Sequence, residues 1–213
     1  MSRPESVYCP GVAGPGVWEG KTHPDGVIVR SGPGKDFPSK GERLPGGCTL
    51  PLAGFCHGQT LRDAWLDLPD NRWFRLNDGR FVASTVVFGN PGPDVEAQPC
   101  AGGIGPPELT ALEGNLTVKG ERLPMVGIAR LREDLRWEQV ALVPADHDRA
   151  TTSLAEPPGT RIAVVACAAA AWPQQGIAAI VTEHGLVDQT DRVADPQARH
   201  AACRAPDRPA AHQ

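Results

Sequence analysis

The chain has 213 residues, of which 40% are hydrophobic, and it contains 24 glycines and 22 prolines. This length predicts one domain or two small ones, and the glycine and proline content predicts short strands joined by many turns. The net charge of −4, without a basic stripe, argues against a nucleic-acid partner, and no apolar run is long enough to span a bilayer.

Residues 1–24 are predicted to form a loose N-terminal arm. Its first residues, MSRPESVYCPGVAGPG, lack the apolar core of a secretory signal. Taken literally, this start predicts a cytoplasmic protein, and a start site further upstream is the competing explanation. The compartment is therefore left open.

Residues 25–88 alternate short apolar runs with turn signals, which is typical of a small all-β domain. The pair Asp78 and Gly79 separates the apolar run WFRL at 73–76 from FVAS at 81–84. An Asp-Gly pair in this setting predicts a β-hairpin.

Residues 89–108, GNPGPDVEAQPCAGGIGPPE, are rich in proline and glycine and are predicted to be a linker. Apolar patterning returns over 109–195, which is predicted to be a second β-rich domain. Within it, MVGIARL at 125–131 and WEQVALV at 137–143 predict two strands around a polar turn, and a helix through 131–142 is the alternative. The small, polar residues 196–213 are predicted to be a disordered tail.

The second half contains segments like those of the first. GCTLPLAGFC at 47–56 is similar to GTRIAVVAC at 159–167, and DGRFV at 78–82 is similar to HGLV at 184–187. These matches predict that the second domain is a degenerate copy of the first. Chance similarity between short β-segments is the alternative.

The first half resembles the bacterial SH3-like domain over about residues 25–88. The motifs are a strand ending in VRSGPG at 29–34, a strand over 50–56, WFRL at 73–76, the Asp-Gly turn and a closing FVAS strand. The cysteine-ended strand and the DGRFV ending look most like versions in secreted proteins of high-GC Gram-positive bacteria (actinobacteria). Residues 57–72 depart from the pattern as a long distal insertion.

This resemblance implies a small, partly open SH3-like barrel, followed by a β-rich and possibly SH3-like second domain. Such domains are usually non-catalytic, and many are thought to bind peptidoglycan peptides. The resemblance also implies a secreted or cell-envelope protein, whereas the chain itself shows no signal sequence.

The aromatic residues of the first half are the main candidates for a ligand site. Trp73 and Phe74 are adjacent on a predicted strand and must face opposite ways, so one is predicted in the core and the other on an exposed shelf. Packing of both in the core is the alternative. Trp65 on the insertion, Arg30 and Asp78 are further candidate ligand contacts. Arg30 is otherwise a solvent-edge residue or a partner of a carboxylate such as Asp78 or Asp36.

The glycine-rich stretch SGPGK at 31–35 is predicted to be a plain turn. A phosphate loop needs a Ser or Thr after the lysine, but Asp36 stands there, and Pro33 removes one backbone N–H. The histidines form no set with metal-ligand spacing, so neither a metal nor another cofactor is expected.

The six cysteines show no Cys-x-x-Cys pair. Free, partly buried thiols are the commonest reading of such a set, and an even count also permits disulfides. Cys48 and Cys56 would lie roughly 26 Å apart on a straight strand, so they pair only if the chain folds back. Cys56 beside His57 makes a poor nucleophile, because neighbours on a strand point apart.

These observations favour a non-catalytic binding module that recognises a cell-wall peptide or another peptidoglycan component. The alternative is a structural or protein-interaction accessory that uses the barrel as a scaffold. A small hydrolase is a third hypothesis, and it would require Cys56 or Cys167 as the nucleophile.

Overall fold

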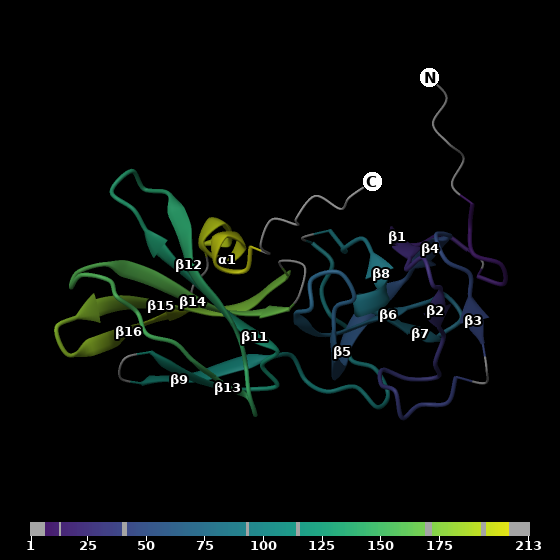
Figure 1. Ribbon diagram of the computed structural model, residues 1–213, viewed down its shortest axis with the longest axis horizontal. Coiled ribbons are helices and arrows are strands. Elements are labelled where there is room, and N and C mark those ends of the chain that lie inside the picture. The colour runs from purple at the N-terminus through teal and green to yellow at the C-terminus, as the bar shows by residue number, and fades with distance from the viewer. Residues whose placement is uncertain are drawn as a thin grey trace, which may run out of the picture. The chain divides into compact units, whose positions relative to one another are not determined.

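The computed structural model describes residues 7–12, 14–39, 42–92, 94–113, 116–168, 172–192 and 195–204 (Figure 1). The chain divides into two compact units. The N-terminal unit comprises Met1–Trp65 and Asp70–Gly105, and the C-terminal unit comprises Leu66–Pro69 and Pro106–Gln213. Both are built almost entirely from small antiparallel sheets, which confirms the predicted all-β class.

The N-terminal unit contains three small sheets and, among its described residues, no closed barrel. The first sheet has the order β4-β1-β8, formed by Thr49–Leu52, Trp18–Thr22 and Val87–Phe88. The second pairs β2 with β3, which are Val27–Ile28 and Arg43–Leu44. The third has the order β5-β6-β7, formed by Gly54–Arg62, Pro69–Arg75 and Phe81–Ala83, and a 3₁₀ turn, Ser84–Val86, follows it.

The predicted hairpin around Asp78 and Gly79 is confirmed. Strands β6 and β7 pair in antiparallel register, with Trp73 opposite Ala83 and Arg75 opposite Phe81. Gly79 has a φ of 84°, which an L-residue rarely adopts, so the turn requires this glycine.

The predicted insertion over 57–72 is mostly strand. β5 runs to Arg62 and β6 begins at Pro69, so only a short turn separates them. The sequence did not predict these strands because several of their buried residues are polar and pair with each other. The Nδ1 of His57 lies 3.1 Å from Oδ1 of Asn71, and Arg72 forms an ion pair with Asp70. Because polar side chains occupy the buried positions, the usual alternation of apolar and polar residues is missing.

The described residues of the C-terminal unit form two sheets and one short helix. The smaller sheet has the order β13-β10-β9, formed by Arg149–Thr151, Thr117–Glu121 and Glu108–Glu113. The larger has the order β12-β11-β14-β15-β16, formed by Trp137–Pro144, Met125–Leu131, Arg161–Ala168, Trp172–Thr182 and Gly185–Arg192. The two predicted strands, 125–131 and 137–143, are confirmed as β11 and β12, and the helical alternative is wrong.

Helix α1, Pro196–Ala202, packs against the larger sheet (Figure 1). The side chain of Asp195 caps it by accepting a hydrogen bond from the backbone N–H of Gln197, and Pro196 occupies its first turn. Ala198 and Ala202 are buried with Met125 and Ala163 of the sheet. The predicted disordered tail is therefore wrong for residues 196–204, and residues 205–213 lie outside the described residues.

All six cysteines form disulfides, so the expectation of free thiols is wrong. The pairs are Cys9–Cys48, Cys56–Cys100 and Cys167–Cys203, with Cα–Cα distances of 5.0, 6.1 and 5.5 Å. Cys48 and Cys56 do not pair with each other. Each disulfide fastens a segment that the sequence predicted to be loose: the N-terminal arm, the linker and the tail.

Two of those segments also contribute backbone pairing. β1 lies inside the predicted arm 1–24 and is the central strand of its sheet, whereas residues 1–6 lie outside the described residues. In the predicted linker, Gln98 N–H donates to the carbonyl of Phe55 and Ile104 N–H donates to that of His57, both at 2.8 Å. The segment up to Gly105 therefore belongs to the N-terminal unit.

The two units share one arrangement. Each contains a three-stranded meander, which is β5-β6-β7 in the first unit and β14-β15-β16 in the second. In each, one cysteine of a disulfide lies on the first strand of the meander (Cys56 or Cys167), and its partner (Cys100 or Cys203) follows the third strand. They also differ, because β14 pairs with β11 as well. That the second unit is a degenerate copy of the first stays a prediction.

None of the helices in the described ranges is long and apolar enough to cross a membrane.

Candidate functional site

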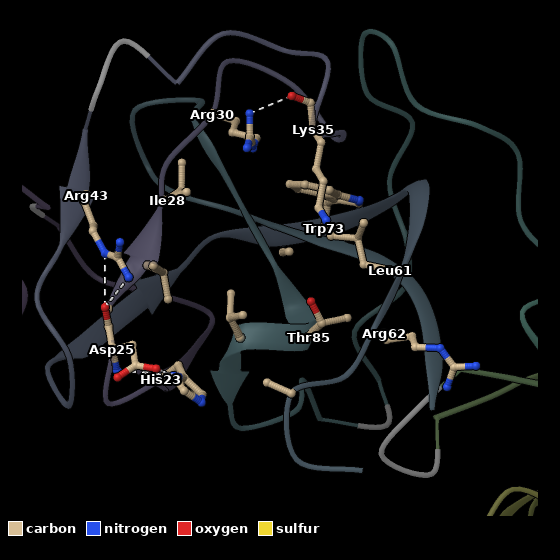
Figure 2. Close-up of a pocket in the computed structure, with 15 residues that line it drawn as sticks. His23, Asp25, Ile28, Arg30, Lys35, Arg43, Leu61, Arg62, Trp73 and Thr85 are labelled. Carbon is tan, nitrogen blue, oxygen red and sulfur yellow. Dashed lines mark hydrogen bonds and ion pairs between the residues drawn. The ribbon is translucent and has the colours of Figure 1, made fainter. Parts of the chain in front are cut away.

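The N-terminal unit contains a pocket of about 450 Å³ (Figure 2). It lies where β2 and β3 meet the β5-β6-β7 sheet, next to the bridge that Arg30 forms with Phe81. Its volume falls in the range of small-molecule sites. Ile28, Leu61 and Val86 contribute apolar surface to its walls.

Trp73 contributes to the base of the pocket while being only 1% exposed. Its Nε1 donates a hydrogen bond of 3.0 Å to the backbone carbonyl of Gln59, so its polar atom is satisfied. The ring is buried in a cluster with Cys56, Phe81 and Ala83, against which Cys100 packs. The pocket therefore has a rigid aromatic base, supported by a disulfide.

Four basic side chains line the pocket: Arg30, Lys35, Arg43 and Arg62. They are four of the ten lysines and arginines in residues 1–90. Among the described residues that line the pocket, Asp25 alone is acidic, so the formal charge of this lining is positive. This concentration of cations stands out in a chain whose net charge is −4.

The two ends of the pocket differ. Arg30 and Lys35 lie at one end, and His23 and Asp25 lie at the other (Figure 2). The Nδ1 of His23 is 3.6 Å from the carboxylate of Asp25, and its ring centroid is 5.2 Å from that of Trp65. Arg43 lies next to Asp25, and its guanidinium donates to the Asp25 carbonyl, so cations lie at both ends of the pocket and the one acidic side chain lies at the second end (Figure 2).

Arg30 does not pair with Asp36 or Asp78, contrary to one expectation. Its Nη1 donates to the backbone carbonyls of Lys35, at 2.7 Å, and Phe37, at 2.9 Å. It therefore fixes the loop that follows it. Arg30 and Trp73 are the two predicted site residues that the fold brings into one pocket.

Phe74 and Trp65 do not line the pocket. Phe74 is 1% exposed and lies edge-on to Trp18, with ring centroids 5.3 Å apart. The predicted exposed shelf at Trp73 or Phe74 is wrong, because both side chains are buried. Trp65 is half-buried beside His23 and lies next to the pocket.

Asp78 lies in the hairpin turn, away from the lining residues. Its carboxylate accepts hydrogen bonds from Nε of Arg80, at 2.7 Å, and from the Arg80 backbone N–H, at 3.0 Å. These bonds lower the pKa of Asp78. Arg80 also pairs with Glu42, so the three residues form a surface ion network that fixes the turn.

The loop after Arg30 uses its own backbone groups internally. The N–H of Lys35 donates to Oε1 of Gln59 at 2.7 Å, and the N–H of Gly34 donates to the carbonyl of Gly32 at 3.0 Å. These N–H groups are therefore not directed at an anion, which agrees with the predicted plain turn. The two candidate nucleophiles, Cys56 and Cys167, are both in disulfides, where the sulfur is not a thiolate.

Sequence reasoning missed His23, Lys35, Arg43 and Arg62. They lie on separate loops and strand ends, and no spacing in the sequence brings them together. The one available signal was the cation next to the glycine-rich turn, Lys35.

The fold and the pocket define a disulfide-braced all-β protein with a pocket lined by basic side chains. No family model, curated protein or solved structure matches the chain. Its similarity to the bacterial SH3-like domain therefore stays a prediction from the motifs.

Proposed function

We propose that the chain is a non-catalytic binding module, and that the pocket of the N-terminal unit binds a short peptide of the bacterial cell wall. The observation that carries this proposal is the cavity of about 450 Å³, with Trp73 at its base and apolar walls from Ile28 and Leu61. A concave, partly apolar site with a few polar groups is the usual form of a small-ligand site.

The disulfides support the cell envelope as the place of action. Disulfides persist mainly in secreted and extracytoplasmic proteins, because cytosolic reductants keep thiols reduced. Three disulfides in one chain, all within the two units, fit a protein that works outside the cytoplasm. A wall peptide is accessible there.

The test is sedimentation with purified Gram-positive peptidoglycan. Ala64 is an exposed turn residue that lines the pocket, and Ala64→Trp narrows the cavity. Ala101→Trp is the matched control, because Ala101 is also an exposed turn alanine of the same unit but does not line the pocket. We expect wild type and Ala101→Trp to sediment with the wall and Ala64→Trp to stay in the supernatant.

Wild-type protein that stays in the supernatant at low salt would overturn this proposal. The accessory role would then be favoured, and one observation points to it. Phe88 is 56% exposed, with its ring 6.2 Å from that of Trp65. Exposed aromatic side chains such as Phe88 are enriched in protein interfaces. Loss of a co-purifying protein in Phe88→Ser would support that role.

A further inference from the structure

We infer that the ligand of this pocket carries a free carboxylate, bound at the end where Arg30 and Lys35 lie. The inference rests on the proposed function and names the chemistry that the same site selects. It follows from three features of the basic side chains: their lack of acidic partners, their fixed positions and their distribution along the pocket.

Three of the cations, Arg30, Lys35 and Arg43, lack acidic partners among the described residues, where none of them forms an ion pair with a carboxylate. Several other arginines do form such pairs: Arg72, Arg80, Arg122 and Arg130 each pair with at least one carboxylate. Cations placed side by side without counter-charges repel each other, and an anionic ligand relieves that repulsion.

The cations are held in place before any ligand arrives. In the part of the chain that the structure describes, Arg30 is anchored through Nη1 alone, which leaves its Nε and Nη2 available there. Arg43 is anchored through Nε and Nη2, which donate to the carbonyl of Asp25 at 3.1 and 2.5 Å. Because backbone carbonyls hold these side chains, a ligand does not have to order them, which lowers the entropic cost of binding.

The loop that carries Lys35 is also held in place. Its backbone bonds to Gln59, and the ring of Phe37 fills the space next to Gly32 and Gly102, where a Cβ would approach to 2.3 Å. Lys35 itself is exposed, and its ammonium has no partner among the described residues. Its backbone is therefore fixed, while its ammonium is not engaged by the described residues.

The distribution of charge gives the orientation. Among the described lining residues no carboxylate stands at the Arg30 and Lys35 end, whereas at the other end Asp25 lies beside Arg43 and offsets its charge. We therefore place the ligand's carboxylate at the Arg30 and Lys35 end and its apolar part against Ile28 and Trp73. A planar carboxylate matches the fork of an arginine. A polyanion such as a nucleic acid fits less well, because the cations line a pocket and the chain carries no basic stripe.

The experiment uses muropeptides released from Gram-positive peptidoglycan by a muramidase, and the same fraction after carbodiimide coupling to ammonia, which converts carboxylates into amides. Isothermal titration calorimetry with the full-length, oxidised protein measures the affinity for each of the two fractions. We expect amidation to weaken binding by at least about tenfold, the loss typical of a charge-assisted hydrogen bond. Lys35→Gln is expected to weaken binding of the acid form about five- to tenfold.

Lys21→Gln is the control variant, because Lys21 is an exposed lysine of the same unit that does not line the pocket. Equal affinity for the acid and amide fractions overturns the inference and leaves the binding module intact. If Lys35→Gln still binds the acid fraction more tightly than the amide fraction, by the same factor as wild type, the carboxylate does not bind at the Arg30 and Lys35 end. Failure of both fractions to bind overturns the proposed function, and the inference with it.

Discussion

Asp70 and Arg72 form a buried ion pair on β6, with Oδ2 and Nη2 2.6 Å apart and side chains 0% and 1% exposed. Two residues apart on a strand, they share one face of the sheet. Nη1 of Arg72 donates to Oδ1 of Asn90 at 2.8 Å, and its guanidinium lies 5.7 Å from the ring centroid of Phe74. The pair therefore links β6 to the segment after β8.

We predict that Arg72→Leu destabilises the protein by about 3–5 kcal/mol, because it leaves the Asp70 carboxylate buried without its counter-charge. Urea unfolding followed by tryptophan fluorescence measures the change. Arg75→Leu is the matched control on the same strand, since Arg75 is partly exposed and its guanidinium donates to Oε1 of Gln98, an uncharged side chain. We expect that control to cost less than about 1 kcal/mol. Equal losses in both variants would contradict the role assigned to the pair.

The Asp70–Arg72 pair also explains why part of the N-terminal fold could not be predicted from the sequence. The Asp78-Gly79 hairpin and the strands β11 and β12 were predictable because local turn chemistry and apolar runs mark them. The extensions of β5 and β6 were not, because Asp70, Asn71 and Arg72 are polar residues at buried strand positions. Their burial depends on partners that only the fold supplies.

The prediction that three segments are loose was wrong for a different reason. The regions around Cys9, Cys100 and Cys203 are rich in small residues, glycine and proline, which is typical of linkers and tails. Disulfides hold these segments against the rest of their units. The sequence did not show this, because the connectivity of six cysteines cannot be deduced from their spacing. The pocket was half predictable: Arg30 and Trp73 belong to recognisable motifs, whereas Arg43 and Arg62 join them only through the fold.

Cys56–Cys100 is predicted to be the first disulfide to be reduced. Cys100 is partly exposed, whereas the other five cysteines are at most 5% exposed. Thiol attack on a disulfide requires access to a sulfur atom. Mild dithiothreitol, alkylation and mass spectrometry at successive times should label Cys56 and Cys100 before the others. Earlier labelling of Cys9 or Cys167 would contradict this order.

The same disulfide supports the pocket, because it packs against Trp73. We predict that the double variant Cys56→Ala/Cys100→Ala loses about 2–5 kcal/mol of stability and also binds muropeptides more weakly. The double variant Cys167→Ala/Cys203→Ala removes a disulfide of the C-terminal unit and serves as the control. It is expected to lose stability while keeping the affinity of the pocket. The comparison is made by calorimetry at a temperature where both variants are folded.

The turn residue Asp78 gives a pH prediction. The hydrogen bonds from Arg80 lower the pKa of Asp78 from its ordinary 3.8. Because the folded pKa lies below the unfolded one, the stabilisation is present at neutral pH and is lost as the pH falls from about 4 through the folded value. Both side chains are partly exposed to solvent, so the contribution is at most about 1 kcal/mol.

Asp78→Asn is therefore expected to be slightly less stable than wild type at pH 7 and equally stable at the acidic end of that window. Thermal unfolding at a series of pH values measures the difference. Asp94→Asn, at an exposed position outside any ion pair of the described residues, is the control. Muropeptide affinity should be unchanged in Asp78→Asn, and a large loss of affinity would return Asp78 to the ligand site.

The final prediction concerns the loop between Arg30 and Lys35. A Cβ at Gly32 would lie 2.3 Å from Cδ1 of Phe37, and Phe37 also abuts Gly102, so the ring cannot shift without moving the loop. We predict that Gly32→Ala destabilises the protein by about 1–3 kcal/mol through overpacking and weakens muropeptide binding, because Lys35 and the carbonyl of Phe37 move. Gly92→Ala is the control, since a Cβ there meets no atom within 4 Å. A Gly32→Ala variant with unchanged affinity would show that the position of this loop does not matter for the ligand.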